Sequence, residues 1–403
     1  MEIVKASRNK AAAETGRKKT SNGSGRGAPH TVLREDCFRI MNEDGSVDPK
    51  RDLKLSKDLL TSMYRNMVMT RAFDERCMML QRQGRIGFYV PSSGQEAIQI
   101  GSAAALRASD WVFPSYREPG VFLHRGAGLH EMLCNLWGNS GDPCLGRQMP
   151  VHYSFPEIKM FSVSSPIATQ VIQAVGAAVA AKIRRTGEVA ITYFGDGGTS
   201  ENDFHTGMTF AGPFQAPVVF ICTNNQLAIS VPLSKQTSAA RLSDKAIGYG
   251  MPGIAVDGND PLAVYSVTRD AVDRARRGEG PTFIECLTFR MGPHSSSDDP
   301  TRYRDEKVYE AWRKRDPIAR MRHYLAEKKL WNDDRENALQ EELKRELLAA
   351  VEKAEAEPLP PIDSLFDDVF AEMTPQLARQ REAMRDEQRL RGKFENTSEA
   401  FPL

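Results

Sequence analysis

The sequence predicts an α/β fold with a doubly wound, mainly parallel sheet, and three observations carry this prediction. Short apolar, β-favouring runs alternate with helical stretches through the middle of the 403-residue chain. Strand, helix and strand follow one another between residues 189 and 222, which makes a βαβ unit whose two strands are parallel neighbours. Glycine and asparagine turns follow these strands, as is typical of the edge where parallel sheets bind ligands.

The region before the first central strand is expected to be helical and rich in loops. Apolar residues recur at helical spacing from Ser56 to Gln83, and Gly84 ends the run. Glycine and proline interrupt the segment that follows, which contains the polar turn 91–94 and the segment 116–118. Loops of this chemistry often line sites. The helix Val171–Ala181 is rich in small residues, which suits either a dense core or a subunit interface.

The central strands and helices are predicted from apolar runs and from the glycine, proline and polar residues that separate them. Strands are expected at 189–194, 217–222, 254–257 and 282–289, and helices at 200–210 and 262–277. The two helices lie between successive strands, which favours parallel pairing.

We divide the chain into three parts on composition. Residues 1–50 form a flexible basic arm, because residues 1–30 carry seven Lys and Arg against two Glu and almost no bulky apolar residue. Residues 51–330 form the α/β domain. Residues 331–403 form a charged helical extension, in which a one-sided stripe between Leu339 and Val351 indicates a surface or partner-facing helix.

Composition excludes several classes of protein. The net charge is +1, so a nucleic-acid partner is not expected. No apolar run reaches the roughly 18–20 residues of a membrane span. Six scattered cysteines without a Cys-x-x-Cys pair argue against a zinc site or a disulfide framework. The arm lacks the apolar face of a transit peptide, so we expect a cytoplasmic location rather than the mitochondrial matrix.

The sharpest chemical feature lies after two neighbouring strands. Gly195–Gly198, with Asp196 at its second position, follows one strand, and Asn224–Asn225 follows the next. A carboxylate and an amide oxygen suit Mg²⁺, which usually completes its shell with water and phosphate oxygens. The glycines allow a diphosphate to approach the backbone, and the helix that begins near Ser200 offers unpaired N–H groups.

This pair of turns resembles the thiamine diphosphate-binding signature, Gly-Asp-Gly followed about thirty residues later by Asn-Asn. The chain is similar, over roughly residues 55–390, to the alpha chains of the decarboxylating component of branched-chain 2-oxo acid dehydrogenase complexes. The resemblance implies the thiamine diphosphate-binding fold with helical N- and C-terminal extensions. The segments that carry it are 146–153, 164–170, 195–201, 224–225 with 228–230, 256–260 and 294–299.

The resemblance also implies the site residues. Asp196, Asn225 and the backbone carbonyl of Leu227 would ligate Mg²⁺. The active-site histidine of the family corresponds to His294, a proton donor or acceptor that also contacts the cofactor. The other cofactor contacts would be Tyr116, Arg117, Ser165, Gly197, Gly198 and Thr223, with Arg117 paired to the diphosphate. A potassium-binding turn found in some members would comprise Ser164, Pro166, Thr169 and Gln170. Ser295 matches a position phosphorylated in mitochondrial relatives, and we expect an unmodified serine.

The implied reaction is oxidative decarboxylation of branched-chain 2-oxo acids, a 3-methyl-2-oxobutanoate dehydrogenase (2-methylpropanoyl-transferring) activity. The acyl group would pass to a lipoyl group of the acyltransferase core of a multienzyme complex. Thiamine enzymes need a carboxylate near the aminopyrimidine ring, and in two-chain relatives a beta-subunit glutamate supplies it. The resemblance therefore implies an α2β2 heterotetramer with a beta subunit.

Two alternatives remain at this point. A pyruvate or acetoin dehydrogenase alpha chain would share the fold, but the apolar segment 88–90 stands where pyruvate-specific relatives carry a histidine, which favours a branched substrate. A regulatory or scaffolding relative without turnover is the second alternative, and the presence of Asp196, Asn225 and His294 argues against it.

Overall fold

The computed structural model describes residues 36–367 and 369–391. Most of the predicted basic arm, residues 1–35, lies outside the described residues, as do residues 392–403. In the part of the chain that the structure describes, no helix is both long and apolar enough to cross a membrane. The six cysteines all lie within the described residues, and none of them forms a disulfide.

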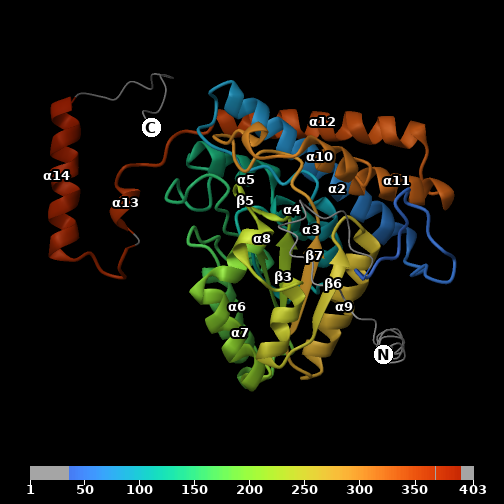
Figure 1. Ribbon diagram of the computed structural model, residues 1–403. Helices are drawn as coiled ribbons and strands as arrows, with labels where there is room; N and C mark the ends of the chain where they lie inside the picture. Colours follow the sequence, from blue (N-terminus) through green and yellow to red (C-terminus); the bar gives the residue numbers. More distant parts are fainter. Residues whose placement is uncertain (1–35, 368, 392–403) are drawn as a thin grey trace. The chain divides into compact units, whose positions relative to one another are not determined.

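Five parallel strands form the central sheet (Figure 1). Their order is β1 (Trp111–Phe113), β2 (Ala190–Gly195), β3 (Val218–Asn224), β7 (Thr282–Leu287) and β6 (Gly253–Asp257). The register pairs Gly195 with Thr223 and Asn224 with Leu287, so β2, β3 and β7 end at one edge. The predicted mainly parallel α/β sheet is confirmed.

Helices cover both faces of the sheet because its strands are apolar on both sides. In β3, Val218 and Phe220 belong to one hydrophobic cluster, and Val219 and Ile221 to another. The first cluster includes α6 (Thr169–Arg184), α7 (Asn202–Phe214) and the 3₁₀ helix η3 (Leu242–Tyr249). The second includes α3 (Glu96–Ala103) and α9 (Pro261–Arg276). Coverage of both faces makes the sheet doubly wound, as predicted.

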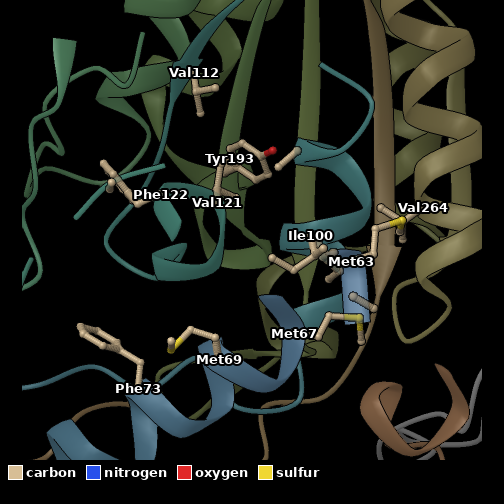
Figure 2. Packing of buried hydrophobic residues seen from close by; sticks show 14 of the residues in the cluster. Met63, Met67, Met69, Phe73, Ile100, Val112, Val121, Phe122, Tyr193 and Val264 are labelled. Atoms are coloured by element: carbon tan, nitrogen blue, oxygen red, sulfur yellow. The ribbon is translucent and has the colours of Figure 1, made fainter. Parts of the chain in front are cut away.

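The long helix α2 (Lys57–Arg82) matches the predicted amphipathic helix. Its N-cap is Ser56, whose hydroxyl accepts a hydrogen bond from the Leu59 amide at 3.3 Å. Figure 2 shows Met63 and Met67 of α2 in the same cluster as Ile100 of α3 and Val264 of α9. This helix therefore packs against α3.

The helix α12 (Asp333–Glu355) carries the predicted leucine stripe. Leu339, Leu343, Leu347 and Val351 are buried in the cluster that also contains α2 and α5 (Leu129–Trp137). The stripe is thus part of the main core, and the charged side chains lie on the opposite, solvent-facing side.

Several local details differ from the sequence prediction. The strand β3 extends two residues further, to Asn224, whereas β7 ends two residues earlier, at Leu287. The Asp196 turn is a 3₁₀ helix, η2 (Asp196–Ser200), and α7 begins only at Asn202. Two short pieces were not expected, β1 and the hairpin of β4 (Leu227–Ala228) and β5 (Val231–Pro232). The remaining elements are α4 (Pro119–Arg125), η1 (Pro156–Ile158), α8 (Leu233–Gln236), η4 (Pro300–Arg302), α10 (Glu306–Arg313), α11 (Pro317–Glu327), α13 (Ser364–Asp367) and α14 (Pro375–Arg391).

Candidate cofactor site

A cavity of about 440 Å³ lies where β2 and β3 end, and it collects most of the predicted site residues. Its volume falls within the usual range for small-molecule and cofactor sites, roughly 300–1,000 Å³. Pro166 and Thr169 are the two predicted site residues that do not line it. The predicted residues that do line it are Tyr116, Arg117, Ser164, Ser165, Gln170, Asp196, Gly197, Gly198, Thr223, Asn225, Leu227 and His294.

Asp196 contributes a buried carboxylate to the lining of this cavity. Its side chain is 1% exposed, and Oδ2 accepts a hydrogen bond from Nε2 of Gln236 at 2.6 Å. Burial raises the pKa of Asp196 to about 6, because its partner is a neutral amide and the charged form loses its hydration. A bound cation would favour the ionised form of this carboxylate.

The two asparagines at the end of β3, Asn224 and Asn225, have different roles. Asn224 is structural: its Nδ2 donates to Glu285 at 2.7 Å, and its Oδ1 accepts from the Gln226 amide at 3.0 Å. Asn225 lines the cavity, and its Oδ1 accepts from the Leu227 amide at 3.2 Å. The sequence predicted the pair, but only the structure separates the residue that shapes the turn from the one that faces the cavity.

The backbone between β3 and β5 is bent by two residues with positive φ, Gln226 at 68° and Ile229 at 56°. A left-handed conformation is unfavourable for a β-branched residue such as isoleucine. The Ile229 carbonyl accepts a hydrogen bond from Nη2 of Arg290 at 2.8 Å, which helps to hold this bend. Nη1 of the same guanidinium lies 3.5 Å from the Leu227 carbonyl, the predicted backbone ligand.

Gly197, in η2, and Gly195, the last residue of β2, are glycines for different steric reasons. A Cβ atom on Gly197 would lie 2.8 Å from Cβ of Ala228, so β4 can pack directly on η2 only if this residue is glycine. A Cβ atom on Gly195 would meet no atom within 4 Å, which leaves open space beside the backbone. This open backbone next to a carboxylate and an amide oxygen fits a diphosphate with its Mg²⁺.

His294 is held in the cavity wall by Arg117. Nη2 of Arg117 lies 3.1 Å from Nδ1 of His294 and donates to the His294 carbonyl at 3.0 Å. Because a guanidinium can only donate, Nδ1 must be the acceptor, and the ring hydrogen is on Nε2. Burial, with Arg117 and then Arg290, lowers the pKa of His294 to about 4, so the imidazole is neutral near pH 7.

A second set of contacts orients the backbone of His294. Its amide donates to Oδ2 of Asp298 at 2.7 Å, and the same oxygen accepts from the Tyr303 hydroxyl at 2.5 Å. Tyr303 in turn accepts a hydrogen bond from Nη2 of Arg290 at 2.9 Å. No motif in the sequence marks Arg290, which lines the cavity and is only 3% exposed.

Residues of the predicted potassium-binding turn form hydrogen bonds with neighbouring parts of the chain. Gln170 donates to the Tyr193 carbonyl at 2.7 Å, and the Thr169 hydroxyl donates to Asp203 at 3.2 Å. Ser165 shares a hydrogen bond of 2.8 Å with Nε2 of His152, which also lines the cavity. The potassium assignment stays a prediction.

One wall of the cavity is apolar. Phe88 and Val90 line it, but Tyr89 between them faces the core, where its hydroxyl donates to Asp74 at 2.6 Å. The alternation along an extended segment explains why only two of the three predicted wall residues reach the cavity. The other apolar lining residues are Met149, Ile167, Phe194, Leu227, Ala228 and Ile229.

Several polar lining residues had no motif that could reveal them in the sequence. Glu118 is 3% exposed, and its Oε2 accepts from both the amide and the hydroxyl of Ser115. Burial raises the pKa of Glu118. Within residues 36–367 and 369–391, no group of three or more His, Cys, Asp or Glu could hold a metal ion by itself. The candidate metal donors are therefore one carboxylate with amide and backbone oxygens.

Comparison with known proteins adds to this geometry. The family model described as "Dehydrogenase E1 component" matches residues 64–363. The human mitochondrial 2-oxoisovalerate dehydrogenase subunit alpha is 41% identical over 358 residues, 88% of this chain and 80% of the relative. The Arabidopsis thaliana 2-oxoisovalerate dehydrogenase subunit alpha 1 is 43% identical over 336 residues, 83% of this chain and 71% of the relative. The Bacillus cereus pyruvate dehydrogenase E1 component subunit alpha is 41% identical over 355 residues, 88% of this chain and 93% of the relative.

Proposed function

The chain belongs to the dehydrogenase E1 component family, a thiamine diphosphate-dependent family of 2-oxo acid dehydrogenases, and from this premise we propose a branched-chain activity. The chain is proposed to be the alpha subunit that carries out oxidative decarboxylation of branched-chain 2-oxo acids such as 3-methyl-2-oxobutanoate. The acyl group then passes to a lipoyl group of an acyltransferase core.

The residues at the ends of β2 and β3 would hold the cofactor. Asp196, Asn225 and the Leu227 carbonyl would hold Mg²⁺, and the open backbone at Gly195, directly before η2, would admit the diphosphate. Arg117 supplies positive charge in the same cavity. When bound, thiamine diphosphate supplies an electron sink for the electron pair left as CO₂ departs. The neutral imidazole of His294 would present its Nε2–H as a hydrogen-bond donor to the substrate or cofactor.

The proposed substrate class depends on one observation, the apolar wall of the cavity. Phe88 and Val90 face a cavity that also contains the buried carboxylate of Asp196. A branched aliphatic group would pack on such a wall, whereas the carboxylate end of the substrate would lie near Arg117 and His294. One methylene changes discrimination by only about 1–3 kcal/mol, so shorter 2-oxo acids are expected to react more slowly rather than be excluded.

We propose that a beta subunit completes the site in an α2β2 heterotetramer. The reaction needs a carboxylate near the aminopyrimidine ring, and the Glu118 carboxylate is already engaged by Ser115. The relatives named as alpha subunits support a two-chain assembly. A cytoplasmic location, a potassium ion at the 164–170 turn and the three-part domain division remain predictions.

A pyruvate dehydrogenase alpha subunit is the second candidate, because the Bacillus cereus relative is as similar as the human one. The two can be separated by kinetics. The chain should be co-expressed with its beta partner, loaded with Mg²⁺ and thiamine diphosphate, and assayed with 3-methyl-2-oxobutanoate and pyruvate. A higher kcat/KM for 3-methyl-2-oxobutanoate supports the proposal, and a higher value for pyruvate selects the alternative. A folded tetramer that decarboxylates neither acid would reject both.

A further inference from the structure

A buried carboxylate outside the cavity lies beneath one of its walls. Asp74 is in the middle of α2, is 1% exposed and does not line the cavity. A buried carboxylate is costly unless it is well hydrogen-bonded, so its partners indicate its role.

Among the described residues, the four hydrogen bonds that Asp74 accepts come from one short segment, residues 89–93. Oδ1 accepts from the Tyr89 hydroxyl at 2.6 Å. Oδ2 accepts from the Ser92 amide at 2.6 Å and from the Ser92 and Ser93 hydroxyls, each at 3.1 Å. These donors are neutral, and burial raises the pKa of Asp74 to about 6. The carboxylate thus fixes the segment that begins directly after Phe88 and contains Val90.

The same segment is joined to the loop that carries His294. The Tyr89 amide donates to the Ser296 hydroxyl at 3.1 Å, and the Ser296 amide donates to the Tyr89 carbonyl at 2.8 Å. At the other end, the Met291 amide donates to the Ser93 carbonyl at 3.0 Å. His294 lies between these two attachment points in the sequence.

Two further features hold residues 89–93 close to the loop at 291–296. Nη1 of Arg117 donates to the Pro91 carbonyl at 2.5 Å, while Nη2 of the same side chain holds His294. A Cβ atom on Gly94 would lie 2.6 Å from Cγ of Met291 and 2.8 Å from the Phe289 carbonyl, so the two loops approach as closely as a glycine allows. A shift of residues 89–93 would therefore be transmitted to the loop at 291–296.

We infer that Asp74 is a positioning residue that sets, through residues 89–93, both the place of His294 and the shape of the apolar substrate wall. This inference rests on the proposed function for its kinetic consequence, but its structural consequence can be measured without turnover. Displacements of about 1 Å at a reacting group can cost up to about 100-fold in rate, so a remote anchor can matter kinetically.

The test uses the complex of this chain with its beta subunit and the variant Asp74→Asn. The amide has nearly the same shape but one acceptor oxygen instead of two. The matched control is Asp260→Asn, because Asp260 is also a buried carboxylate that accepts from neutral donors, the amides of Ile40, Met41, Leu262 and Ala263.

Hydrogen exchange is the first readout. In Asp74→Asn we expect the amides of Met291 and Ser296 to exchange about tenfold faster, whereas in Asp260→Asn the faster exchange should appear at Ile40 and Met41. Kinetics is the second readout. We expect kcat/KM for 3-methyl-2-oxobutanoate to fall about tenfold in Asp74→Asn, with a lower ratio to pyruvate and a cofactor Kd within about twofold of the wild type.

A folded Asp74→Asn complex with unchanged exchange at Met291 and Ser296 overturns the inference, as does unchanged kcat/KM with an unchanged substrate ratio. If Asp74→Asn does not fold, the double variant Ser92→Ala/Ser93→Ala removes two donors and keeps the carboxylate. Unchanged exchange at Met291 and Ser296 in that variant also overturns the inference. A wild-type complex that decarboxylates neither substrate refutes the proposed function, while the exchange measurement still decides the role of Asp74.

Discussion

Arg117 donates to the backbone carbonyl of His294 at 3.0 Å, and the same Nη2 atom lies 3.1 Å from the Nδ1 atom of that histidine. This side chain therefore fixes the orientation and the tautomer of the imidazole, and it adds to the effect of burial in keeping the ring neutral. Because the guanidinium is permanently positive, it disfavours a second positive charge on His294.

The first prediction concerns the charge of Arg117. Replacement of Arg117 by Met should raise the pKa of His294 above its present value of about 4, because one positive neighbour is removed. The pKa should stay below 6.5, since burial is the larger cause and is unchanged. Activity that needs the neutral imidazole is lost as the pH falls through this pKa, so the acid limb of the kcat/KM profile should move to higher pH.

Arg117→Lys is the matched control for this prediction, because it keeps the charge and loses the fork of donors. Its rate should fall while its acid limb stays close to that of the wild type. An acid limb at the same pH in the wild type and in Arg117→Met would contradict the electrostatic argument.

The second prediction concerns the metal site. Asp196→Ala removes the only carboxylate among the proposed Mg²⁺ ligands, so Mg²⁺-dependent binding of thiamine diphosphate should weaken about 100-fold or more. Calorimetric titration of the complex with its beta subunit measures this directly. Asp270→Ala, at an exposed position on α9, should bind normally. Undiminished affinity in Asp196→Ala would remove Asp196 from the metal site.

The third prediction concerns the backbone of η2. Gly197→Ala would place Cβ 2.8 Å from Cβ of Ala228, so β4 would have to shift. Overpacking of this kind costs about 1–3 kcal/mol. We expect a lower Tm and weaker cofactor binding, because the Leu227 carbonyl belongs to the displaced strand. Gly248→Ala, where a Cβ meets nothing within 4 Å, should change neither quantity, and equal behaviour of the two variants would refute the steric argument.

The substrate wall gives a fourth prediction. Phe88→Ala should lower the ratio of kcat/KM for 3-methyl-2-oxobutanoate over pyruvate by about tenfold, because the apolar contact of the branched group is lost. Phe370→Ala, at a side chain that is 58% exposed, is the control. If the ratio is the same in both variants, Phe88 does not contact the branched group.

Much of this site could be predicted from the sequence because its residues follow strands directly. Asp196 and Asn225 each come at the end of an apolar run, and the parallel arrangement of β2 and β3 brings them to one edge. A local pattern therefore has a predictable position in space. The sheet itself follows from the same alternation of apolar runs and helices.

The parts that could not be predicted depend on contacts between distant segments. Gln236 donates to Asp196 from α8, a helix of only four residues, which is too short to show a hydrophobic periodicity in the sequence. In the sequence, Asp74 cannot be distinguished from the other polar residues of an amphipathic helix. Its role depends on hydrogen bonds from segment 89–93, which packs against it only in the folded chain. The sequence also does not show that Phe88 and Val90 line the cavity whereas Tyr89 does not, because this depends on the direction of each side chain.

The last prediction concerns stability at acid pH. The pKa of His294 is about 4 in the folded chain and about 6.5 in an unfolded one, so between these values the unfolded chain binds the additional proton. This group therefore contributes stability that is present above pH 6.5 and is lost as the pH falls towards 4. Its effect amounts to about 1–2 kcal/mol after allowance for partial exposure.

His294→Gln removes this titration and should lose less Tm than the wild type between pH 7 and pH 5, at a fixed concentration of the complex. Asp74 and Asp196, whose pKa values are raised to about 6, act with the opposite sign in both proteins and cancel in the comparison. His323→Gln, at an exposed position on α11, should behave as the wild type. An equal loss of Tm in the wild type and in His294→Gln would mean that the imidazole is not kept neutral by the fold.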